Sequence, residues 1–539
     1  SSLKINNWAR TIMLKAVILI GGPSKGTRFR PLSLDVPKPL FPVAGLPVVQ
    51  HHIDACYRLG QKRSSISEDN SNSNVGKYCV AEVLLLGYYG DDELAEFLLT
   101  ATQSYPSLRI RYLREPDALG TAGGLYHFRD TILAPLDNSE GEQVQAFFVM
   151  NGDVCADFPL DEMLDMHFNN NSHQSQHQQK QPVLITVMAT ETTRQQSVHY
   201  GCMVVDKETN IIQHYVEKPS TFVSNTVNCG VYLCSPRLFD TIADIHLEIL
   251  NSNGNGNQQN ISRYTTSNNK NNINQQLQQK PVEERVAGAM VMWMEQDVLR
   301  RLAGESGSSC SSMSSGGDGS GRIKKGSKCG GVALAATTRN WWSQLKTAGA
   351  AIYANRHYLA LRQQRQRLLQ QQHESVIDLP SPVKCRLATA DPKGYSTIGN
   401  VYVHPSAQVH PTALLGPNVS VGEGAYIDQG VRIKESIVLQ DAVIGQHSLV
   451  MHSIIGRRAK VGAWCRVEGS AACSDPNPNV AYAKMTPQLP LFNALDGRLN
   501  PSITILGCGV NVESEVVLLN SIVLPYKTLT RSYKNEIIL

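Results

Sequence analysis

The sequence contains no apolar run of about 18 residues, the length that a helix needs to cross a bilayer. Its first dozen residues, SSLKINNWARTI, lack the apolar core and the cleavage site of a signal peptide. The 12 cysteines are scattered without a CxxC pair or a Cys/His cluster, so we expect neither a disulfide framework nor a zinc site. We therefore expect a soluble, cytoplasmic protein without a membrane partner.

Charge is also scarce, because only 18% of the residues are charged and the net charge is +4. So mild a balance gives no electrostatic reason to expect binding to nucleic acid or to an anionic membrane. The 539 residues are enough for two or more domains, each with a sizeable core.

The most informative segment spans residues 14–47, LKAVILIGGPSKGTRFRPLSLDVPKPLFPVAGLP. An uncharged, β-branched run is followed by Gly21 and Gly22, then by Arg28 and Lys38. Glycines directly after a parallel strand let backbone N–H groups approach a phosphate, and nearby cations neutralise it. No Gly-Lys-Ser/Thr follows the glycines, which excludes a Walker loop. The segment therefore predicts a phosphate-binding strand end of another type.

Short apolar runs alternate with helical stretches from residue 14 to about residue 245, which is typical of a doubly wound α/β domain. In such domains ligands bind at the carboxyl ends of the strands. The expected strands are Ala16–Ile20, Glu82–Leu86, Arg109–Leu113, Ala146–Met150, Val183–Met188 and Cys229–Leu233.

Four segments rich in Asn, Gln, Ser and Gly interrupt this pattern, and we expect them to be disordered surface insertions. A helix-like stretch over residues 346–373 then closes the first domain, which we place at residues 14–373. The four insertions lie near residues 64–74, 169–181, 251–279 and 304–331.

Apolar residues recur at every sixth position in the C-terminal part. They run from Val403 to Ile433 and, after a phase slip, from Ile437 to Val467. This hexapeptide repeat predicts a parallel β-helix over residues 395–539. The pattern returns at Val510, Val516 and Ile522 after an inserted loop at residues 470–501, and so long a loop is either a plain surface loop or functional.

The segment 14–47 resembles the signature of the sugar-1-phosphate nucleotidylyltransferases, G-G-x-G-T-R-x-R-P-L followed by P-K-P. Within that family it looks most like the alpha subunits of GDP-mannose pyrophosphorylase (mannose-1-phosphate guanylyltransferase). The resemblance implies a Rossmann-like nucleotidyltransferase domain followed by a left-handed β-helix that mediates self-association. One departure is clear, because Pro23-Ser24-Lys25 stand where catalytic members have a single residue.

The resemblance also implies roles for polar residues that follow the predicted strands. Glu115, Gly120 and Thr121 would recognise the nucleobase, and Asp153 would be one Mg²⁺ ligand of catalytic members. Taken singly, each could instead be a helix start, a turn residue or an ordinary surface residue. The residues expected to bind GDP-mannose are Gly21, Gly22, Glu115, Gly120, Thr121, Asp153, Gly201, Glu217, Lys218, Asn228 and Gln344.

The segment Trp341-Trp342-Ser343-Gln344-Leu345-Lys346 stands where catalytic relatives have F-W-x-D-I-G, whose aspartate is the second metal ligand. A neutral amide is a poor Mg²⁺ ligand but a good hydrogen-bond partner. We therefore expect no metal site and no intact catalytic set. The residues expected to be vestigial are Arg28, Lys38, Asp153 and Lys218.

Together these features predict a non-catalytic regulatory subunit that binds GDP-mannose without a cofactor. It would convey feedback inhibition to a catalytic beta subunit. The alternative is an active Mg²⁺-dependent GTP:mannose-1-phosphate guanylyltransferase, while an acyltransferase β-helix lacks a convincing catalytic histidine. The loop residues expected to contact the partner are Ser474, Asp475, Pro476, Asn477, Pro478 and Asn479.

Overall fold

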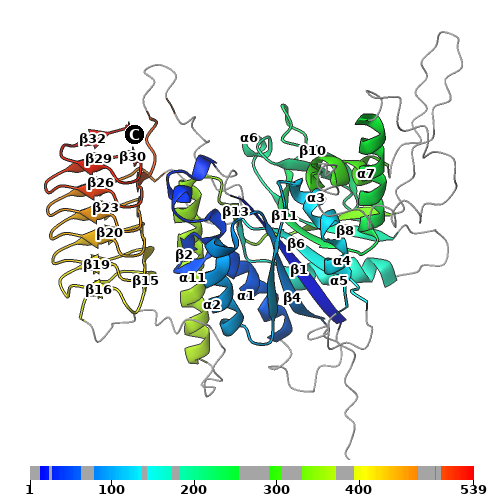
Figure 1. The fold of residues 1–539 in the computed structure, drawn as a ribbon, viewed down its shortest axis with the longest axis horizontal. Coiled ribbons are helices and arrows are strands. Elements are labelled where there is room, and N and C mark those ends of the chain that lie inside the picture. Colours follow the sequence, from blue (N-terminus) through cyan, green and yellow to red (C-terminus); the bar gives the residue numbers. More distant parts are fainter. Residues whose placement is uncertain are drawn as a thin grey trace, which may run out of the picture.

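The computed structural model describes residues 12–22, 27–61, 78–135, 143–172, 182–253, 291–305, 331–371, 394–471, 492 and 499–539. These residues form an N-terminal α/β domain and a C-terminal solenoid of parallel strands. The long helix α11 (Ala348–Gln371) lies between the two (Figure 1). This helix confirms the prediction of a helix over residues 346–373.

The α/β domain is built on a nine-stranded sheet of order β10-β9-β11-β6-β1-β4-β5, with β8 paired to β11 and β12 paired to β8. Strand β1 lies in the centre and pairs in parallel with β4 and β6. All six predicted strands are present. The strands are β1 (Ile12–Gly21), β4 (Tyr78–Gly87), β5 (Arg109–Arg114), β6 (Phe147–Asn151), β8 (Val183–Glu191), β9 (Gly201–Val205), β10 (Ile212–Glu217), β11 (Thr226–Cys234) and β12 (Val332–Thr337).

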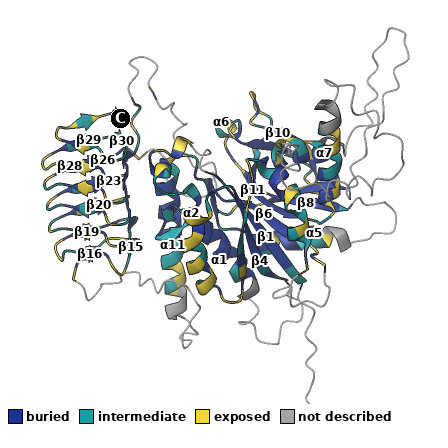
Figure 2. Ribbon diagram, in the orientation of Figure 1, coloured by how far each residue is buried: buried dark blue, intermediate teal, exposed yellow. Residues whose placement is uncertain are grey.

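Helices cover both faces of this sheet, whose strands are largely buried (Figure 2). The side chains of the strands alternate between the two resulting cores. In β1, Ala16 and Ile18 pack on one side and Val17 on the other. The first core contains α1 (Val48–Gln61), α2 (Asp91–Ser104) and α5 (Leu160–Ser172). The second contains α3 (Gly120–His127), α4 (Arg129–Leu133), α7 (Leu238–Asn253), the π-helical turn Met294–Leu299 and α10 (Arg300–Glu305).

Shorter elements join these layers. They are β2 (Pro42–Val43), β3 (Leu46–Pro47), β7 (Val154–Ala156), α6 (Arg194–Ser197), β13 (Trp342–Gln344) and the helical turns Thr27–Phe29, Leu32–Leu34 and Lys38–Leu40.

Three of the predicted disordered insertions begin inside helices. Residues 169–172 end α5, residues 251–253 end α7 and residues 304–305 end α10. These helices reach the first residues of the approximate insertion bounds, since extending a formed helix by one turn costs little even with polar residues. The rest of the insertions, including residues 64–74, lies outside the described residues.

The C-terminal domain consists of three parallel sheets whose strands stack from coil to coil, which is consistent with the predicted left-handed β-helix. The first sheet contains β14 (Ser396–Thr397), β17 (Leu414–Leu415), β20 (Arg432–Lys434), β23 (Leu449–Met451), β26 (Arg466–Glu468), β29 (Val517–Leu519) and β32 (Tyr533–Lys534). The second contains β15 (Val401–Val403), β18 (Val419–Val421), β21 (Ile437–Val438), β24 (Ser453–Ile455), β27 (Thr504–Leu506), β30 (Ile522–Val523) and β33 (Ile537–Ile538). The third contains β16 (Gln408–Val409), β19 (Tyr426–Ile427), β22 (Val443–Ile444), β25 (Lys460–Val461), β28 (Asn511–Val512) and β31 (Thr528–Leu529).

The predicted repeat phase was wrong by one residue in one coil. The residues that fill the solenoid there are Val438, Ile444 and Val450, in place of the predicted Ile437, Val443 and Leu449. The error arose because each of these positions has an apolar neighbour, so the six-residue spacing fits either choice. After the inserted loop Val510 and Val516 are buried as predicted, whereas Val523 fills the core in place of Ile522.

The outer face of the second solenoid sheet is apolar and packs against α11 and the α/β domain. Ile437, Ile454 and Ile505 are buried there in one cluster with Trp341 and Leu359. This face explains why residues that do not fill the solenoid are still apolar: they form the contact between the domains.

Polar contacts fix the position of the two domains relative to each other. The side chain of Asn355 in α11 accepts a hydrogen bond from the Ala44 N–H at 2.8 Å and donates one to the Asn418 carbonyl at 3.4 Å. Arg356, the next residue of α11, forms an ion pair with Glu435 at 3.0 Å. The domains are therefore joined by specific contacts as well as by apolar packing.

The predicted partner loop lies largely outside the described residues, and Ser474–Asn479 lie wholly outside them. Within the described part, Phe492 pairs with Leu499 in an isolated bridge. None of the helices that the structure describes combines the length and the apolar character required to cross a membrane.

Candidate functional site

A cavity of about 530 Å³ opens at the carboxyl ends of the central strands of the α/β domain. Every residue that the sequence predicts as binding or vestigial lines it. These residues are Gly21, Gly22, Arg28, Lys38, Glu115, Gly120, Thr121, Asp153, Gly201, Glu217, Lys218, Asn228 and Gln344. The inserted residues 23–25 lie outside the described residues.

The double glycine shapes the floor of the cavity. Gly21 ends β1 with a φ of +68°, which an L side chain rarely adopts, and a Cβ on Gly22 would lie 2.3 Å from the ring of Tyr88. The carbonyl of Gly21 also accepts a hydrogen bond from the Tyr88 N–H at 2.9 Å. A side chain at either glycine would therefore strain or displace the strand end.

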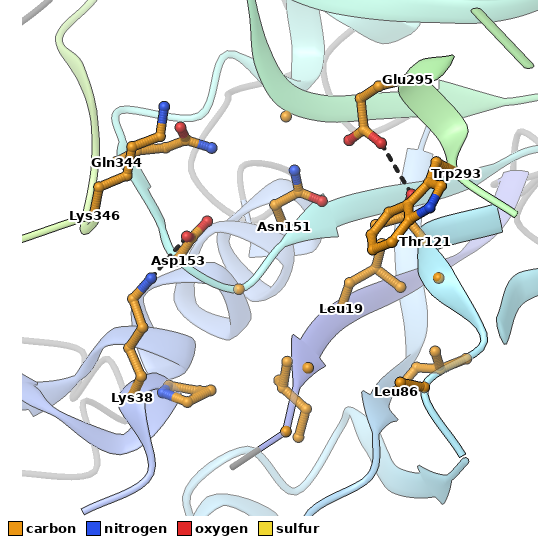
Figure 3. A pocket seen from close by; sticks show the side chains of 18 of the residues that line it. Leu19, Lys38, Leu86, Thr121, Asn151, Asp153, Trp293, Glu295, Gln344 and Lys346 are labelled. Atoms are coloured by element: carbon orange, nitrogen blue, oxygen red, sulfur yellow. Dashed lines mark hydrogen bonds and ion pairs between the residues drawn. The ribbon is translucent and has the colours of Figure 1, made fainter. Parts of the chain in front are cut away.

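Lys38 and Asp153 form an ion pair on one side of the cavity, with 2.8 Å between Nζ and Oδ2 (Figure 3). Burial alone would raise the pKa of Asp153, but Lys38, with Lys346 and His52 beyond it, outweighs that effect and lowers the pKa below its usual value. Asp153 is therefore an ionised carboxylate that already has a cationic partner.

Gln344 is brought to Asp153 by strand pairing. Strand β13 runs antiparallel to β7, with Gln344 opposite Val154, and the Leu345 N–H donates to the Asp153 carbonyl at 2.8 Å. The Trp342 indole donates to the Cys229 carbonyl at 2.9 Å and holds β13 against the sheet. The amide thus occupies the place for which the resemblance implies a second carboxylate.

Lys346 also lines the cavity, and the sequence did not lead us to assign it a role. Its ammonium donates to the His199 carbonyl at 3.4 Å and lies 3.9 Å from the centroid of the Tyr200 ring. Burial lowers the pKa of Lys346 to about 8, although Asp153 acts in the opposite direction. The available signal was its place in the segment 341–346, where it stands at the glycine of the F-W-x-D-I-G pattern.

The residues around Asp153 do not fit the Mg²⁺ ion that the nucleotidylyltransferase resemblance implies. Magnesium prefers carboxylate and water oxygens. Here one carboxylate is paired with Lys38, the second ligand position is the amide of Gln344, and the ammonium of Lys346 lines the same cavity. Within the described residues no group of three or more His, Cys, Asp or Glu side chains could hold a metal ion.

Glu115 provides a buried carboxyl group on another wall of the cavity. Its Oε1 atom has no hydrogen-bond partner among the described residues, and a Cβ on Gly124 would lie 2.2 Å from it. Burial, and to a smaller extent Asp117, raise the pKa of Glu115 to about 7. This carboxyl group can accept hydrogen bonds from a ligand that enters the cavity.

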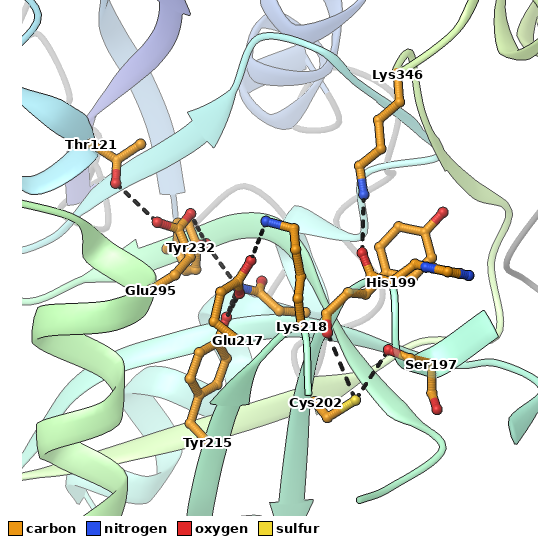
Figure 4. A network of polar contacts seen from close by, with 12 residues as sticks. Thr121, Ser197, His199, Cys202, Tyr215, Glu217, Lys218, Tyr232, Glu295 and Lys346 are labelled. Atoms are coloured by element: carbon orange, nitrogen blue, oxygen red, sulfur yellow. Dashed lines mark hydrogen bonds and ion pairs between the residues drawn. The ribbon is translucent and has the colours of Figure 1, made fainter. Parts of the chain in front are cut away.

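A network of hydrogen bonds joins the Thr121 side of the cavity to Glu217 (Figure 4). Thr121 donates to Glu295 at 3.0 Å, and Asn228 donates to the hydroxyl of Tyr215 at 3.3 Å. Tyr215 in turn donates to Glu217 at 2.7 Å. Glu295 was not predicted, because it follows a long Asn/Gln-rich segment and has no local motif around it.

The matches to sequence profiles of known families follow the same division of the chain. The profile of the nucleotidyl transferases matches residues 15–295, and that of the GMPPB C-terminal domain matches residues 397–538. The first match contains most of the cavity residues, and the second contains most of the solenoid.

Curated relatives match the chain over almost its full length. A Drosophila melanogaster protein named mannose-1-phosphate guanylyltransferase regulatory subunit alpha is 48% identical over 532 residues. The alpha-A regulatory subunit of Danio rerio and the alpha regulatory subunit of Homo sapiens are each 44% identical, over 531 and 528 residues. Each match covers 98% of this chain and 100% of the relative. The chain therefore belongs to the family of mannose-1-phosphate guanylyltransferase regulatory alpha subunits, within the nucleotidyl transferases.

Proposed function

We propose that this chain is a regulatory subunit that binds GDP-mannose in the cavity and conveys feedback inhibition to a catalytic beta subunit. The observation that carries the proposal is a cavity that all the residues predicted to bind the ligand line, but that lacks a second carboxylate beside Asp153 for a metal. Gln344 lies beside Asp153, and Asp153 is paired with Lys38. Such a site favours binding over turnover, because the metal chemistry of phosphoryl-group transfer has lost half of its ligands.

Glu115 supports guanine as the base. Guanine carries N–H donors on N1 and on its exocyclic N2, and an ionised carboxylate can accept both. Glu115 lines the cavity, and although burial raises its pKa to about 7, N–H donors from a bound ligand would favour its ionised form. A base with an acceptor at these positions would leave the carboxylate unsatisfied.

Glu217 and Asn228 support a sugar ligand. Both line the cavity and are held by Tyr215, which accepts from Asn228 and donates to Glu217, so the lone pairs left on their side-chain oxygens are held in a fixed arrangement. Carboxylate and amide groups suit the hydroxyls of a hexose, because a hydroxyl both donates and accepts. Lys218 is paired with Glu217 at 2.7 Å and adds a positive charge at the mouth of the cavity.

Calorimetric titration of the purified chain with GDP-mannose tests this proposal, with UDP-glucose as the comparison ligand. We expect GDP-mannose to bind and UDP-glucose to bind much more weakly. A parallel assay with GTP and mannose 1-phosphate should give no turnover by the chain alone. Robust turnover would favour the alternative of an active guanylyltransferase, for which Arg28, Lys38, Asp153 and Lys218 lie together in the cavity.

Reconstitution with a catalytic beta subunit tests the regulatory part. We expect GDP-mannose to inhibit the complex, and an Asn228→Leu variant of this chain to abolish that inhibition. Linkage requires that the beta subunit and GDP-mannose change each other's affinity for this chain by the same factor. Deletion of residues 474–479 tests the proposed partner contact, and it should weaken inhibition without weakening GDP-mannose binding. Self-association through the solenoid and a cytoplasmic location are further proposals.

A further inference from the structure

The cavity holds one half-buried cation whose contacts carry no formal charge. Lys38 is paired with Asp153 and Lys218 is paired with Glu217. The ammonium of Lys346, in contrast, contacts a backbone carbonyl and an aromatic ring, and no described carboxylate forms an ion pair with it. A cation that is partly removed from water and lacks an anionic partner loses hydration without compensation, so the site suits a negatively charged ligand.

We propose that Lys346 takes the place of a divalent metal ion: its ammonium group binds the diphosphate of the nucleotide sugar, so that the cavity holds this ligand without a metal. The inference rests on the proposed function, because it names the group that neutralises the diphosphate of that ligand. It follows from the poor fit of the Asp153 and Gln344 pair to Mg²⁺.

The position of Lys346 supports this role. The backbone that leads to Lys346 is fixed by two hydrogen bonds, because the Leu345 N–H donates to the Asp153 carbonyl at 2.8 Å and the Lys346 N–H donates to the Gln344 carbonyl at 2.8 Å. The Leu345 side chain is fully buried in the cluster between the domains. Lys346 therefore lies beside the carboxylate that would hold a metal in a catalytic relative, with its ammonium directed toward the cavity (Figure 3).

Basic and acidic side chains are equally numerous in the lining, but burial raises the pKa of two of the acidic ones, Glu115 and Glu295. The charged side chains that act on the pKa of Lys346 are Asp153 and Glu217, which raise it, and Lys218 and Arg28, which lower it. Four basic side chains line the cavity, namely Arg28, Lys38, Lys218 and Lys346. The acidic side chains in the lining are Asp153 and Glu217, which form the ion pairs with Lys38 and Lys218, and Glu115 and Glu295. The two basic side chains outside the ion pairs, Arg28 and Lys346, can neutralise a diphosphate without a metal.

The test is calorimetric titration of the full chain with GDP-mannose, once in EDTA and once in excess MgCl₂. We expect equal affinity in the two buffers. Lys346→Met keeps much of the side-chain length but removes the charge. It should weaken binding in EDTA by about tenfold to a hundredfold, the usual effect of losing a charge-assisted hydrogen bond. Lys346→Arg keeps the charge and should retain most of the affinity.

Lys460→Met is the matched control, because Lys460 is exposed on β25 of the solenoid and should not affect binding. Thermal melts of all variants show whether the fold is intact. A second variant, Gln344→Asp with Lys346→Gly, should make binding stronger in MgCl₂ than in EDTA.

Three results would overturn the inference and leave the proposed function standing. They are wild-type binding that requires Mg²⁺, tight binding in EDTA by a folded Lys346→Met chain, and a doubly substituted chain that gains no metal dependence. Absence of GDP-mannose binding in both buffers would overturn the proposed function itself, and the inference with it.

Discussion

At the scale of single residues, Glu115 links the chemistry of the cavity to the stability of the fold. Burial raises the pKa of Glu115 from 4.5 to about 7, so the folded chain holds this proton more tightly than the unfolded chain. The group therefore lowers the stability of the folded state as the pH rises from about 5 to about 8. Glu115→Gln is neutral at every pH and avoids this loss.

We expect the melting temperature of Glu115→Gln, relative to that of the wild type, to rise between about pH 5 and about pH 8. Differential scanning calorimetry without ligand measures this difference. Glu208→Gln, an exposed change, should follow the wild-type curve at each pH. If Glu115→Gln also ran parallel to the wild type, Glu115 would not be held in its neutral form by the fold.

The cavity residues that could be predicted from the sequence are those that follow strands with a recognisable motif. Gly21 and Gly22 follow an apolar run, and Asp153 follows another, so local patterns place them at one edge of the sheet. Lys346 and Glu295 could not be predicted in the same way. Their positions depend on the pairing of β13 with β7 and on the packing of the turn Met294–Leu299 against Thr121, which are contacts between distant segments.

At the scale of elements, α11 holds the two domains through Asn355. Its amide bonds both to Ala44 and to Asn418, and the Asn355 side chain is fully buried. Asn355→Ala leaves the buried Ala44 N–H without its partner. We expect a loss of about 1–3 kcal/mol in the free energy of unfolding, measured by urea denaturation. Gln364→Ala, at an exposed position of the same helix, should stay within about 0.5 kcal/mol of the wild type.

The solenoid shows how a repeat can be predicted while its phase is not. Ile444 is fully buried in the solenoid core, whereas Val443 pairs with Lys460 and Tyr426 on the outer face of the third sheet. Both residues are apolar and adjacent, so the sequence alone does not decide between them. The choice follows from the shorter five-residue step between Ile433 and Val438, which turns the coil into the second sheet.

Because Ile444 points into the solenoid and Val443 points outward, we expect opposite effects of a lysine at these two positions. Ile444→Lys places an unpaired charge inside the solenoid and should prevent the chain from accumulating as a folded protein. Val443→Lys adds a lysine beside the exposed Lys460, and we expect a change in stability within about 0.5 kcal/mol. Circular dichroism and soluble yield distinguish the two. If Ile444→Lys were tolerated and Val443→Lys were disruptive, Val443 would fill the core, as the sequence predicted, and the observed register would be wrong.

At the scale of the whole molecule, the cavity and the solenoid are joined through one apolar cluster. Trp341 immediately precedes β13, which carries Gln344 to the cavity, and it belongs to the same cluster as Ile454 and Ile505 of the solenoid. Asp35, which follows the segment containing Arg28, lies 3.8 Å from Arg457 of the solenoid. Because both contacts lead from segments that line the cavity, the two domains should unfold as one unit.

The substitution Ile454→Asp tests this coupling, because it places a charge in the cluster between the domains without changing a residue that fills the solenoid. The wild type should unfold in one calorimetric transition, and GDP-mannose should shift that transition upward as a ligand of the folded state. In Ile454→Asp we expect two transitions, of which GDP-mannose shifts only that of the α/β domain. Tyr426→Asp, on the exposed third sheet, should keep the single transition. A single ligand-shifted transition in Ile454→Asp would mean that the cluster does not couple the cavity to the solenoid.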